Sequence, residues 1–194
     1  LSNEWHFEEL KDMENWDDPI NPDITSQFRR WQRDISQRSG LTANVAILGS
    51  NAIEKLYHNQ KWREEMKFFQ VSFGNYTPKY IGDGVTFVGV IPSLGIELYT
   101  YNEWFVDSDK KEKPMLDPNL VIMGSTQAYT SMMYGCVVDP SLGAFATPRV
   151  PKSWIQNKPG ERFLQISSRP MPVPHQLDAF MTVKVCTDAP LQLP

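Results

Sequence analysis

The strongest constraint on the fold is a change in the spacing of apolar residues along the chain. Near the start, four bulky apolar residues recur every three or four positions, as on one face of a helix: Ile24, Phe28, Trp31 and Ile35. Pro22 after the capping residue Asn21, and Gly40 just past the end, bound a predicted helix at 22–38. From Val71 onward the apolar period becomes two, which is typical of strands. The pattern therefore predicts helices followed by a largely stranded second half.

The remaining elements follow from short apolar runs and the turn residues between them. Val45–Leu48 is predicted as a buried strand that ends at Gly49 and is followed by a helix capped by Asn51. Further strands are predicted over five runs: 85–91, 96–101, 120–123, 163–167 and 179–186. A charged surface loop is expected at 107–114, and the alternating prolines of 170–174 are expected to form a stiff connection. Together these elements predict the α+β class, with mostly antiparallel sheets and flanking helices.

The charge of the chain is unevenly distributed. The net charge is −4 and the pI is near 5.4, so general binding to a phosphate backbone has little support. The first 24 residues carry eight acidic side chains and a single basic one, Lys11. We expect this run to be a solvated arm. The alternative, a contact arm that lies on a basic neighbouring surface, stays open because the run also contains Trp5, Phe7 and Trp16.

The sequence contains no pattern typical of a membrane-spanning helix, a disulfide-rich fold or a metal site. No apolar run approaches the roughly 18 residues of a membrane-spanning helix, and the acidic start does not resemble a signal peptide, so no membrane partner is expected. Cys136 and Cys186 lie outside any CxxC motif, and both are expected to be small buried hydrophobic residues. The three histidines lie in separate segments, so we predict neither a metal nor a cofactor: His6, His58 and His175.

The sequence lacks the GxSxG, HExxH and GxxxxGK[ST] motifs, and we predict that the chain is not an enzyme. A tyrosine-rich strand at 99–105 carries Tyr99, Tyr101 and Trp104. Such aromatic side chains stack on sugars in some binding sites, and they are also enriched at subunit interfaces. We favour a core or interface role for them. The alternative is a glycan-binding module or a glycoside hydrolase that uses this strand with nearby carboxylates.

Several short segments follow one another in a characteristic order. The series begins with the strand at 96–101 and the charged loop, and it continues through five further pieces: Met115–Ser125, Tyr134–Asp139, Arg149–Trp154, Phe163–Pro170 and His175–Val185. Upstream, the helix at 22–38 and the strand and helix within 45–57 keep the same order of elements. Over about 25–186, the chain resembles the lambda-type phage major capsid proteins, the major capsid protein E family.

The resemblance implies the Hong Kong 97-type phage capsid fold, which has a peripheral and an axial domain. On this basis we expect 1–40 to be an acidic arm and helix of the peripheral domain. The axial α+β domain is expected at 41–149, and the return strands of the peripheral domain at 150–194. Because family members run longer at the N-terminus, the family's N-terminal arm and extended loop are expected to be absent from this chain.

The implied function is that of a structural head protein of a tailed bacteriophage or prophage, which self-assembles into an icosahedral shell that encloses DNA. The expected partners are other copies of the chain in hexamers and pentamers, a scaffold or decoration protein, and packaged DNA held without sequence recognition. The expected location is the virion capsid, after assembly in the bacterial host cytoplasm.

Six residues are the candidate subunit contacts. They come from the tyrosine-rich strand and from the basic stretch 149–169: Tyr99, Tyr101, Trp104, Arg149, Lys152 and Arg162. The basic stretch and the acidic N-terminal run have opposite charge, so we predict that the two meet between subunits and set their register.

Overall fold

The structure is a computed structural model of the 194-residue chain, and it describes residues 4–73, 78–156 and 160–187. The chain forms two compact units. Unit 1 comprises Leu1–Ala128 and Gln176–Pro194, and unit 2 comprises Tyr129–His175. These boundaries do not coincide with the divisions expected after residues 40 and 149. The assignment of peripheral and axial domains stays a prediction.

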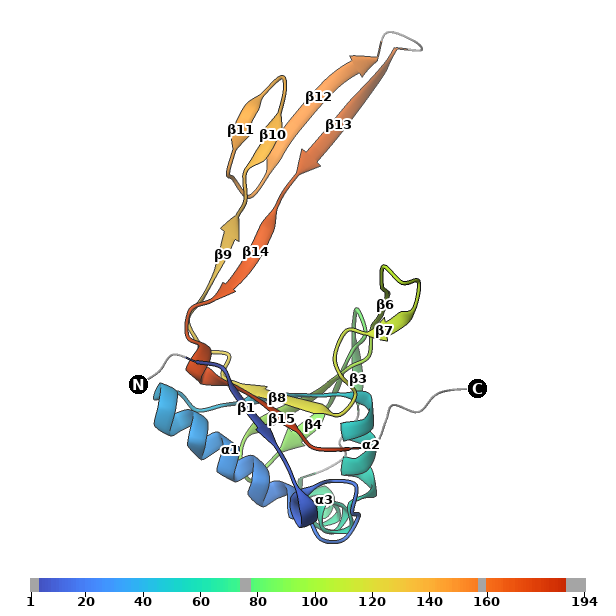
Figure 1. Cartoon of the computed structure of the whole chain (residues 1–194), viewed down its shortest axis with the longest axis vertical. Helices are drawn as coiled ribbons and strands as arrows, with labels where there is room; N and C mark the ends of the chain where they lie inside the picture. The colour runs from blue at the N-terminus through green and yellow to red at the C-terminus, as the bar shows by residue number, and fades with distance from the viewer. Residues whose placement is uncertain (1–3, 74–77, 157–159, 188–194) are drawn as a thin grey trace. The chain divides into compact units, whose positions relative to one another are not determined.

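Unit 1 is built on a seven-stranded mixed sheet with the strand order β1–β15–β8–β2–β5–β4–β3 (Figure 1). The strands have these bounds: β1 His6–Glu9, β2 Val45–Leu48, β3 Lys79–Gly82, β4 Val85–Ile91, β5 Ile96–Tyr101, β8 Leu120–Gly124 and β15 Phe180–Lys184. Strand β1 pairs with β15, and β2 with β5, in parallel. The other four neighbouring pairs are antiparallel. The predicted α+β class with mostly antiparallel pairing is confirmed.

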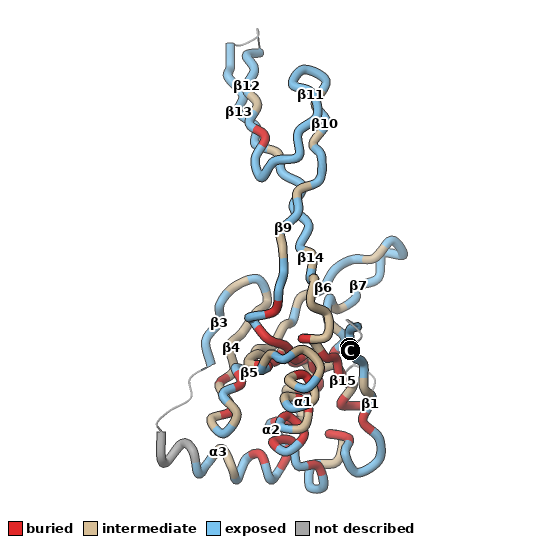
Figure 2. The backbone as a smooth tube through the Cα atoms, turned by 90° about the vertical axis from the view of Figure 1, so that its left-hand side faces the viewer, coloured by how far each residue is buried: buried red, intermediate tan, exposed pale blue. Residues whose placement is uncertain are grey.

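Three helices supply the core on one face of this sheet: α1 Ile24–Ser39, α2 Ser50–His58 and α3 Gln60–Phe73. Alternate strand residues, such as Ala46, Val121 and Met181, pack with the helices in a single buried cluster. The four residues of the predicted apolar stripe of α1 are each at most 1% exposed, so the predicted stripe is confirmed. Figure 2 shows the buried residues gathered in this part of the chain.

The ends of the first two helices differ in detail from the prediction. Asp23, rather than Asn21, caps α1, because its carboxylate accepts a hydrogen bond from the backbone N of Ser26 at 3.1 Å. Gly40 ends α1 in the left-handed conformation, with φ of +74°, as its position predicts. Asn51 does not cap α2 but lies inside it, and its side chain donates to Asn119 Oδ1 at 2.9 Å.

The N-terminal acidic run is part of the fold, so the prediction of a solvated arm was wrong. Strand β1 forms one edge of the sheet, and Leu10 and Trp16 after it are 2% and 1% exposed. The Trp16 ring lies 6.1 Å from Phe28 and 6.5 Å from Trp31, measured between ring centroids. Its Nε1 donates to Gln27 Oε1 at 2.7 Å. Burial of these large apolar groups outweighs the solvation of the carboxylates around them.

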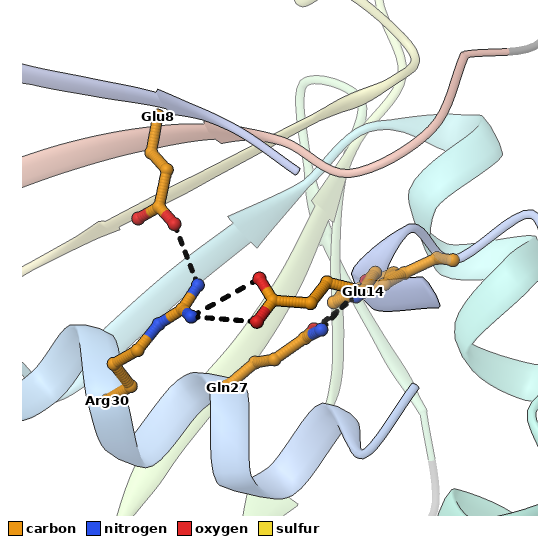
Figure 3. Close-up of polar contacts among 5 residues, drawn as sticks. Glu8, Glu14, Gln27 and Arg30 are labelled. Atoms are coloured by element: carbon orange, nitrogen blue, oxygen red, sulfur yellow. Dashed lines mark hydrogen bonds and ion pairs between the residues drawn. The ribbon is translucent and has the colours of Figure 1, made fainter. Parts of the chain in front are cut away.

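Basic side chains of unit 1 neutralise several acids of this run. Arg30 on α1 contacts Glu8 at 2.7 Å and Glu14 at 3.1 Å (Figure 3). Gln27 Nε2 donates to the backbone oxygen of Glu14 at 2.8 Å, which fixes the same turn. Two further ion pairs join the run to β15 and α2: Lys184–Glu9 at 2.9 Å and Lys55–Asp17 at 3.4 Å. Much of the acidic charge is therefore engaged within the chain.

Unit 2 consists of three two-stranded antiparallel ladders, β9–β14, β10–β11 and β12–β13. The strands have these bounds: β9 Thr130–Tyr134, β10 Val137–Asp139, β11 Gly143–Phe145, β12 Val150–Gln156, β13 Glu161–Ser167 and β14 Pro170–Pro174. Among the residues that the structure describes in this unit, Val150 alone is buried (Figure 2). Unit 2 therefore has almost no core of its own.

The proline-rich segment is a paired strand rather than a free connection. Three prolines occupy alternate positions of β14: Pro170, Pro172 and Pro174. Backbone N–H groups at alternate positions of a strand point to the same edge, and proline has no N–H, so one edge of β14 lacks three donors. That edge faces away from β9, because the ladder needs the N–H groups of Met171 and Val173. The outer edge of β14 thus offers no donors at three positions, which hinders pairing with a further strand.

Two other expectations need correction. The charged segment at 107–114 is not a simple loop, because Glu112–Pro114 (β7) pairs with Trp104–Val106 (β6) in a short hairpin. Cys186 is buried as predicted, whereas Cys136 is exposed. Cys136 lies in unit 2, where no core is available to cover it.

Candidate subunit-contact surfaces

The sheet of unit 1 has a second face, opposite the helices. Residues that pair directly on neighbouring strands share a face, and the registers place one row of seven across the sheet: Phe7, Thr182, Ile122, Ile47, Tyr99, Phe87 and Lys79. Five of the seven are apolar or aromatic. Phe7 is 57% exposed, and the other four are half-buried, whereas Leu48 and Leu98 at the alternate positions are at most 1% exposed. Within the row Thr182 is buried, and it accepts a hydrogen bond from Trp5 Nε1 at 2.8 Å. We call this row the open sheet face.

The two tyrosines among the candidate subunit contacts lie on the same side of the sheet as this row. The Tyr99 ring lies 5.4 Å from the Phe87 ring, and its hydroxyl donates to Glu97 Oε2 at 2.7 Å. The Tyr101 hydroxyl donates to Glu103 Oε2 at 2.8 Å. Each hydrogen bond to a carboxylate raises the pKa of the tyrosine above its ordinary value. The hydroxyls are therefore engaged within the chain, and the half-buried rings remain as contact surface.

The third aromatic candidate, Trp104, lies in a separate hairpin. It begins β6, is 53% exposed, and its Nε1 donates to Asn102 Oδ1 at 3.1 Å. Phe105 and Val106 follow it and are also exposed. A two-stranded hairpin cannot bury both of its faces, so this hairpin leaves three large apolar side chains accessible.

Hairpin β12–β13 in unit 2 carries apolar side chains on both faces. On one face Trp154 stacks on Phe163, with ring centroids 5.5 Å apart and an interplanar angle of 13°. The other face, which we call the aliphatic ribbon face, consists of three cross-strand pairs: Pro151–Ile166, Ser153–Leu164 and Ile155–Arg162. Its three large aliphatic side chains are 69 to 77% exposed: Ile155, Leu164 and Ile166.

The three basic candidates in unit 2 have different environments. Lys152 pairs with Asp139 at 2.6 Å, and its Nζ lies 5.9 Å from the centroid of Trp154. Arg149 and Arg162 are exposed, and neither side chain has a polar partner within the described parts of the chain. Arg162 belongs to the aliphatic ribbon face, whereas Arg149 immediately precedes β12. The structure therefore leaves the two arginines available for contacts with other molecules.

Sequence reasoning missed Leu164 and Ile166 as contact candidates. The sequence predicts a strand at 163–167, but neither residue is among the predicted contacts. The available signal was that Phe163 and Leu164 are adjacent, so each face of the strand carries a large apolar side chain besides its polar ones. Large apolar side chains on both faces need cover on both sides, and the described residues of unit 2 bury neither Phe163 nor Leu164.

Asp139 joins hairpin β10–β11 to β12. Besides Lys152, its carboxylate accepts hydrogen bonds from Ser141 N at 2.8 Å, from Ser141 Oγ at 2.6 Å and from Leu142 N at 3.2 Å. The Lys152 ammonium is the largest cause that holds the pKa of Asp139 far below its ordinary value, followed by the contacts with Ser141. One carboxylate thus organises the turn and its link to the next strand.

We expect acid to loosen this link. A carboxyl group whose folded-state pKa is depressed stabilises the fold fully above its unfolded pKa of about 4, and that stabilisation is lost as the pH falls further. Hydrogen exchange of β10–β11 amides, corrected for intrinsic rates, should show lower protection at pH 3 than at pH 7. In Asp139→Asn the protection should already be low at pH 7 and vary little with pH. An equal pH dependence in both proteins would contradict the assignment.

The described residues give little support for a metal site, a membrane-spanning helix or a glycan site at the tyrosine-rich strand. No three His, Cys, Asp or Glu side chains gather as a metal site requires within residues 4–73, 78–156 and 160–187. None of the described helices is long and apolar enough to cross a membrane. A cavity of about 310 Å³ in unit 1 lies between α2, α3 and β4, and its lining includes neither Tyr99 nor Tyr101.

Comparisons with known proteins agree on one family. The family model described as phage major capsid protein E matches residues 7–185. The major capsid proteins of Enterobacteria phage phi80 and Escherichia phage lambda are 32% and 30% identical to the chain over 111 residues, which is 55% of this chain and 32% of each relative. The matched region thus spans about a third of the length of these relatives.

Solved structures give the same result. The chain resembles a protein assigned as a capsid protein of a prophage in Escherichia coli CFT073, with 26% identity and a TM-score of 0.64 over 92% of this chain and 52% of that one. A phage-related protein from Bordetella bronchiseptica RB50 shares the fold, at 12% identity and a TM-score of 0.56, over 92% of this chain and 54% of that one. Since the family match runs through both units, the chain belongs to the phage major capsid protein E family.

Proposed function

We propose that this chain belongs to the structural head protein of a tailed phage or prophage, which assembles with copies of itself into a closed icosahedral shell around DNA. The observation that carries the proposal is the apolar surface that unit 2 leaves uncovered. Of its large hydrophobic residues, twelve are at least 36% exposed, and Val150 alone is buried among those described. A shell subunit must present such surfaces to several neighbours at once.

The energetics favour covering these surfaces by other protein. A two-stranded ribbon alone is marginally stable in water. Burial of one Leu or Ile side chain contributes about 1.5–3 kcal/mol, so contacts along the ribbon would stabilise it together with the assembly. In closed symmetry each contact recurs many times, and many weak contacts make a durable shell.

The further partners follow from the same role. The net charge of −4 supports enclosed DNA that is held without sequence recognition, rather than a DNA-reading surface. A scaffold or decoration protein would meet the same exposed surfaces during or after assembly. The virion capsid is the proposed location, with assembly in the bacterial host cytoplasm, and no cofactor or catalysis is required by this role.

Electron microscopy of the gene product overexpressed in bacteria tests the proposal, with light scattering of the 194-residue chain measured in parallel. Closed shells or curved sheets are the expected result. Uniform monomers, both alone and in lysates of cells that carry the complete set of phage head genes, would overturn the proposal.

Charge reversal at the basic stretch of unit 2 should impair assembly while the subunit stays folded. For Arg149→Glu with Lys152→Glu we expect at least tenfold fewer shells, because like charges would then meet the acidic surface of a neighbour. Since Lys152 also holds Asp139, Arg162→Glu serves as a matched variant, because Arg162 forms no ion pair with the residues that the structure describes. Unchanged shell yield with Arg149→Glu and Arg162→Glu together, at unchanged circular dichroism, would remove this role from the arginines.

A further inference from the structure

We propose that the aliphatic ribbon face of one copy docks on the open sheet face of a second copy. The inference rests on the proposed self-assembly and specifies which two surfaces meet. It assigns Arg162, Leu164 and Ile166 to one side of the contact, and Ile47 and Tyr99 to the other. The occupant of each surface is therefore another copy of this chain.

The two surfaces match in kind and in size. Both are pleated sheet faces that carry alternate apolar side chains, and such faces pack against one another with interdigitated side chains. Thr182 on β15 is buried, so the continuous exposed part of the row crosses the five strands from β8 to β3, about 19 Å at a spacing of about 4.8 Å. The seven residues of β12 extend for about 23 Å. The ribbon is therefore long enough to cover the exposed part of the row.

Charge complementarity favours contacts between unlike units. Unit 2 contains five Lys or Arg and two Asp or Glu residues, a net charge of +3, which leaves −7 for unit 1. Locally, Arg162 is the charged member of the aliphatic ribbon face. Glu97 lies on the open side of the sheet beside Tyr99, because it pairs with Val45 in register with that face, and it is the acid there that Arg162 would meet. The basic side chains on that side lie towards its two edges, Lys79 on β3 and Lys184 on β15, where Lys184 is paired with Glu9. Contacts of unit 1 with unit 1 would instead bring like charges together.

Edge-to-edge pairing is the other way for a ribbon to meet a second copy. The prolines of β14 remove three donors from its outer edge, which opposes such pairing along that ladder. In β12, Pro151 likewise has no N–H to give to a neighbouring strand. These prolines oppose edge pairing along β14 and at one position of β12, and we therefore place the contact on a face of the ribbon.

Photo-crosslinking with isotopically mixed copies tests the contact. Ser153, an exposed small residue in the middle of the aliphatic ribbon face, is replaced by the photoreactive amino acid p-benzoylphenylalanine in a ¹⁵N-labelled chain, which is mixed with unlabelled chain. We expect crosslinks from labelled to unlabelled protein, in peptides that contain residues 45–48, 97–101 or 120–122. Crosslinks within a single copy, or to other peptides of the second copy, would overturn the proposal.

A pair of neighbouring substitutions gives an independent measurement. Leu164 and Gln165 are adjacent and exposed but lie on opposite faces of β13. By light scattering over a concentration series, Leu164→Asp should weaken self-association by tenfold to hundredfold, as expected from the burial of one leucine, and Gln165→Asp by less than threefold. Equal effects of the two variants, with circular dichroism unchanged, would overturn the docking.

The two proposals can fail separately. Shells that form normally while Ser153 crosslinks elsewhere would remove the docking and leave the shell function intact. Specific crosslinks between copies without any shells, even in the presence of the other head proteins, would confirm the docking and remove the shell function.

Discussion

Replacement of Trp16 by alanine should lower the free energy of unfolding by about 3–5 kcal/mol, the usual cost of truncating a large buried aromatic residue. Trp16 is 1% exposed and packs against Phe28 and Trp31 of α1. The substitution also removes the donor to Gln27 Oε1, which would leave a buried acceptor without its partner. Urea denaturation followed by circular dichroism at 222 nm measures the effect, since the helices all lie in unit 1.

Trp104→Ala is the matched control for this prediction. Trp104 is 53% exposed and contacts Asn102 through an exposed hydrogen bond, so its removal should cost less than about 1 kcal/mol. Comparable losses for the two tryptophans would show that Trp16 is not part of the core. A loss below about 1.5 kcal/mol for Trp16→Ala alone would lead to the same conclusion.

Gly49→Ala should destabilise unit 1 by about 3 kcal/mol or more, the upper range for an added group in a packed site. A Cβ on Gly49 would lie 2.5 Å from the backbone oxygens of both Asp117 and Pro118. The backbone there cannot easily move away, because the Pro118 oxygen accepts hydrogen bonds from the N–H groups of Asn51 and Ala52. The added methyl group would therefore push α2 away from the start of β8.

Gly40→Ala separates steric overlap from backbone strain. A Cβ on Gly40 would meet nothing within 4 Å, but the residue has a φ of +74°. We expect a loss of about 1–2 kcal/mol from the left-handed conformation alone. Thermal denaturation of the two variants side by side should show the larger decrease for Gly49→Ala. The reverse order would refute the close approach of the two backbone segments.

Local patterns accounted for much of the secondary structure. The predicted strands 45–48, 85–91 and 96–101 have the bounds of β2, β4 and β5, and α1 begins at Ile24 rather than at residue 22. These elements were predictable because the spacing of apolar residues and the turn residues at the ends are local features, which depend on only a few neighbouring positions. The cap of α1 was misplaced because Asn21 and Asp23 are both good caps, and only the observed hydrogen bond to Ser26 separates them.

The contact surfaces were only partly predictable. Tyr99, Tyr101 and Trp104 stood out by composition, and the structure places the two tyrosines on the open side of the sheet and Trp104 in an exposed hairpin. Leu164 and Ile166 did not stand out, because a strand with apolar residues looks the same whether or not anything packs on it. The prediction that the acidic run is a solvated arm was wrong because the residues that hold the run are distant in sequence. Its partners Arg30 and Lys184 are about 20 and 175 positions away.

The sequence by itself determined which side chains share a face. The apolar stripe of α1 and the alternation of side chains between the two faces of β2, β5 and β8 follow from backbone geometry alone. No contact with a distant part of the chain is needed to establish them. Only the tertiary structure decided which of those faces is covered. Val121 and Ile122 are adjacent apolar residues, yet the helices bury the first and leave the second on the open sheet face. Covering a face requires elements from far along the chain, and the choice among them depends on packing the whole unit at once.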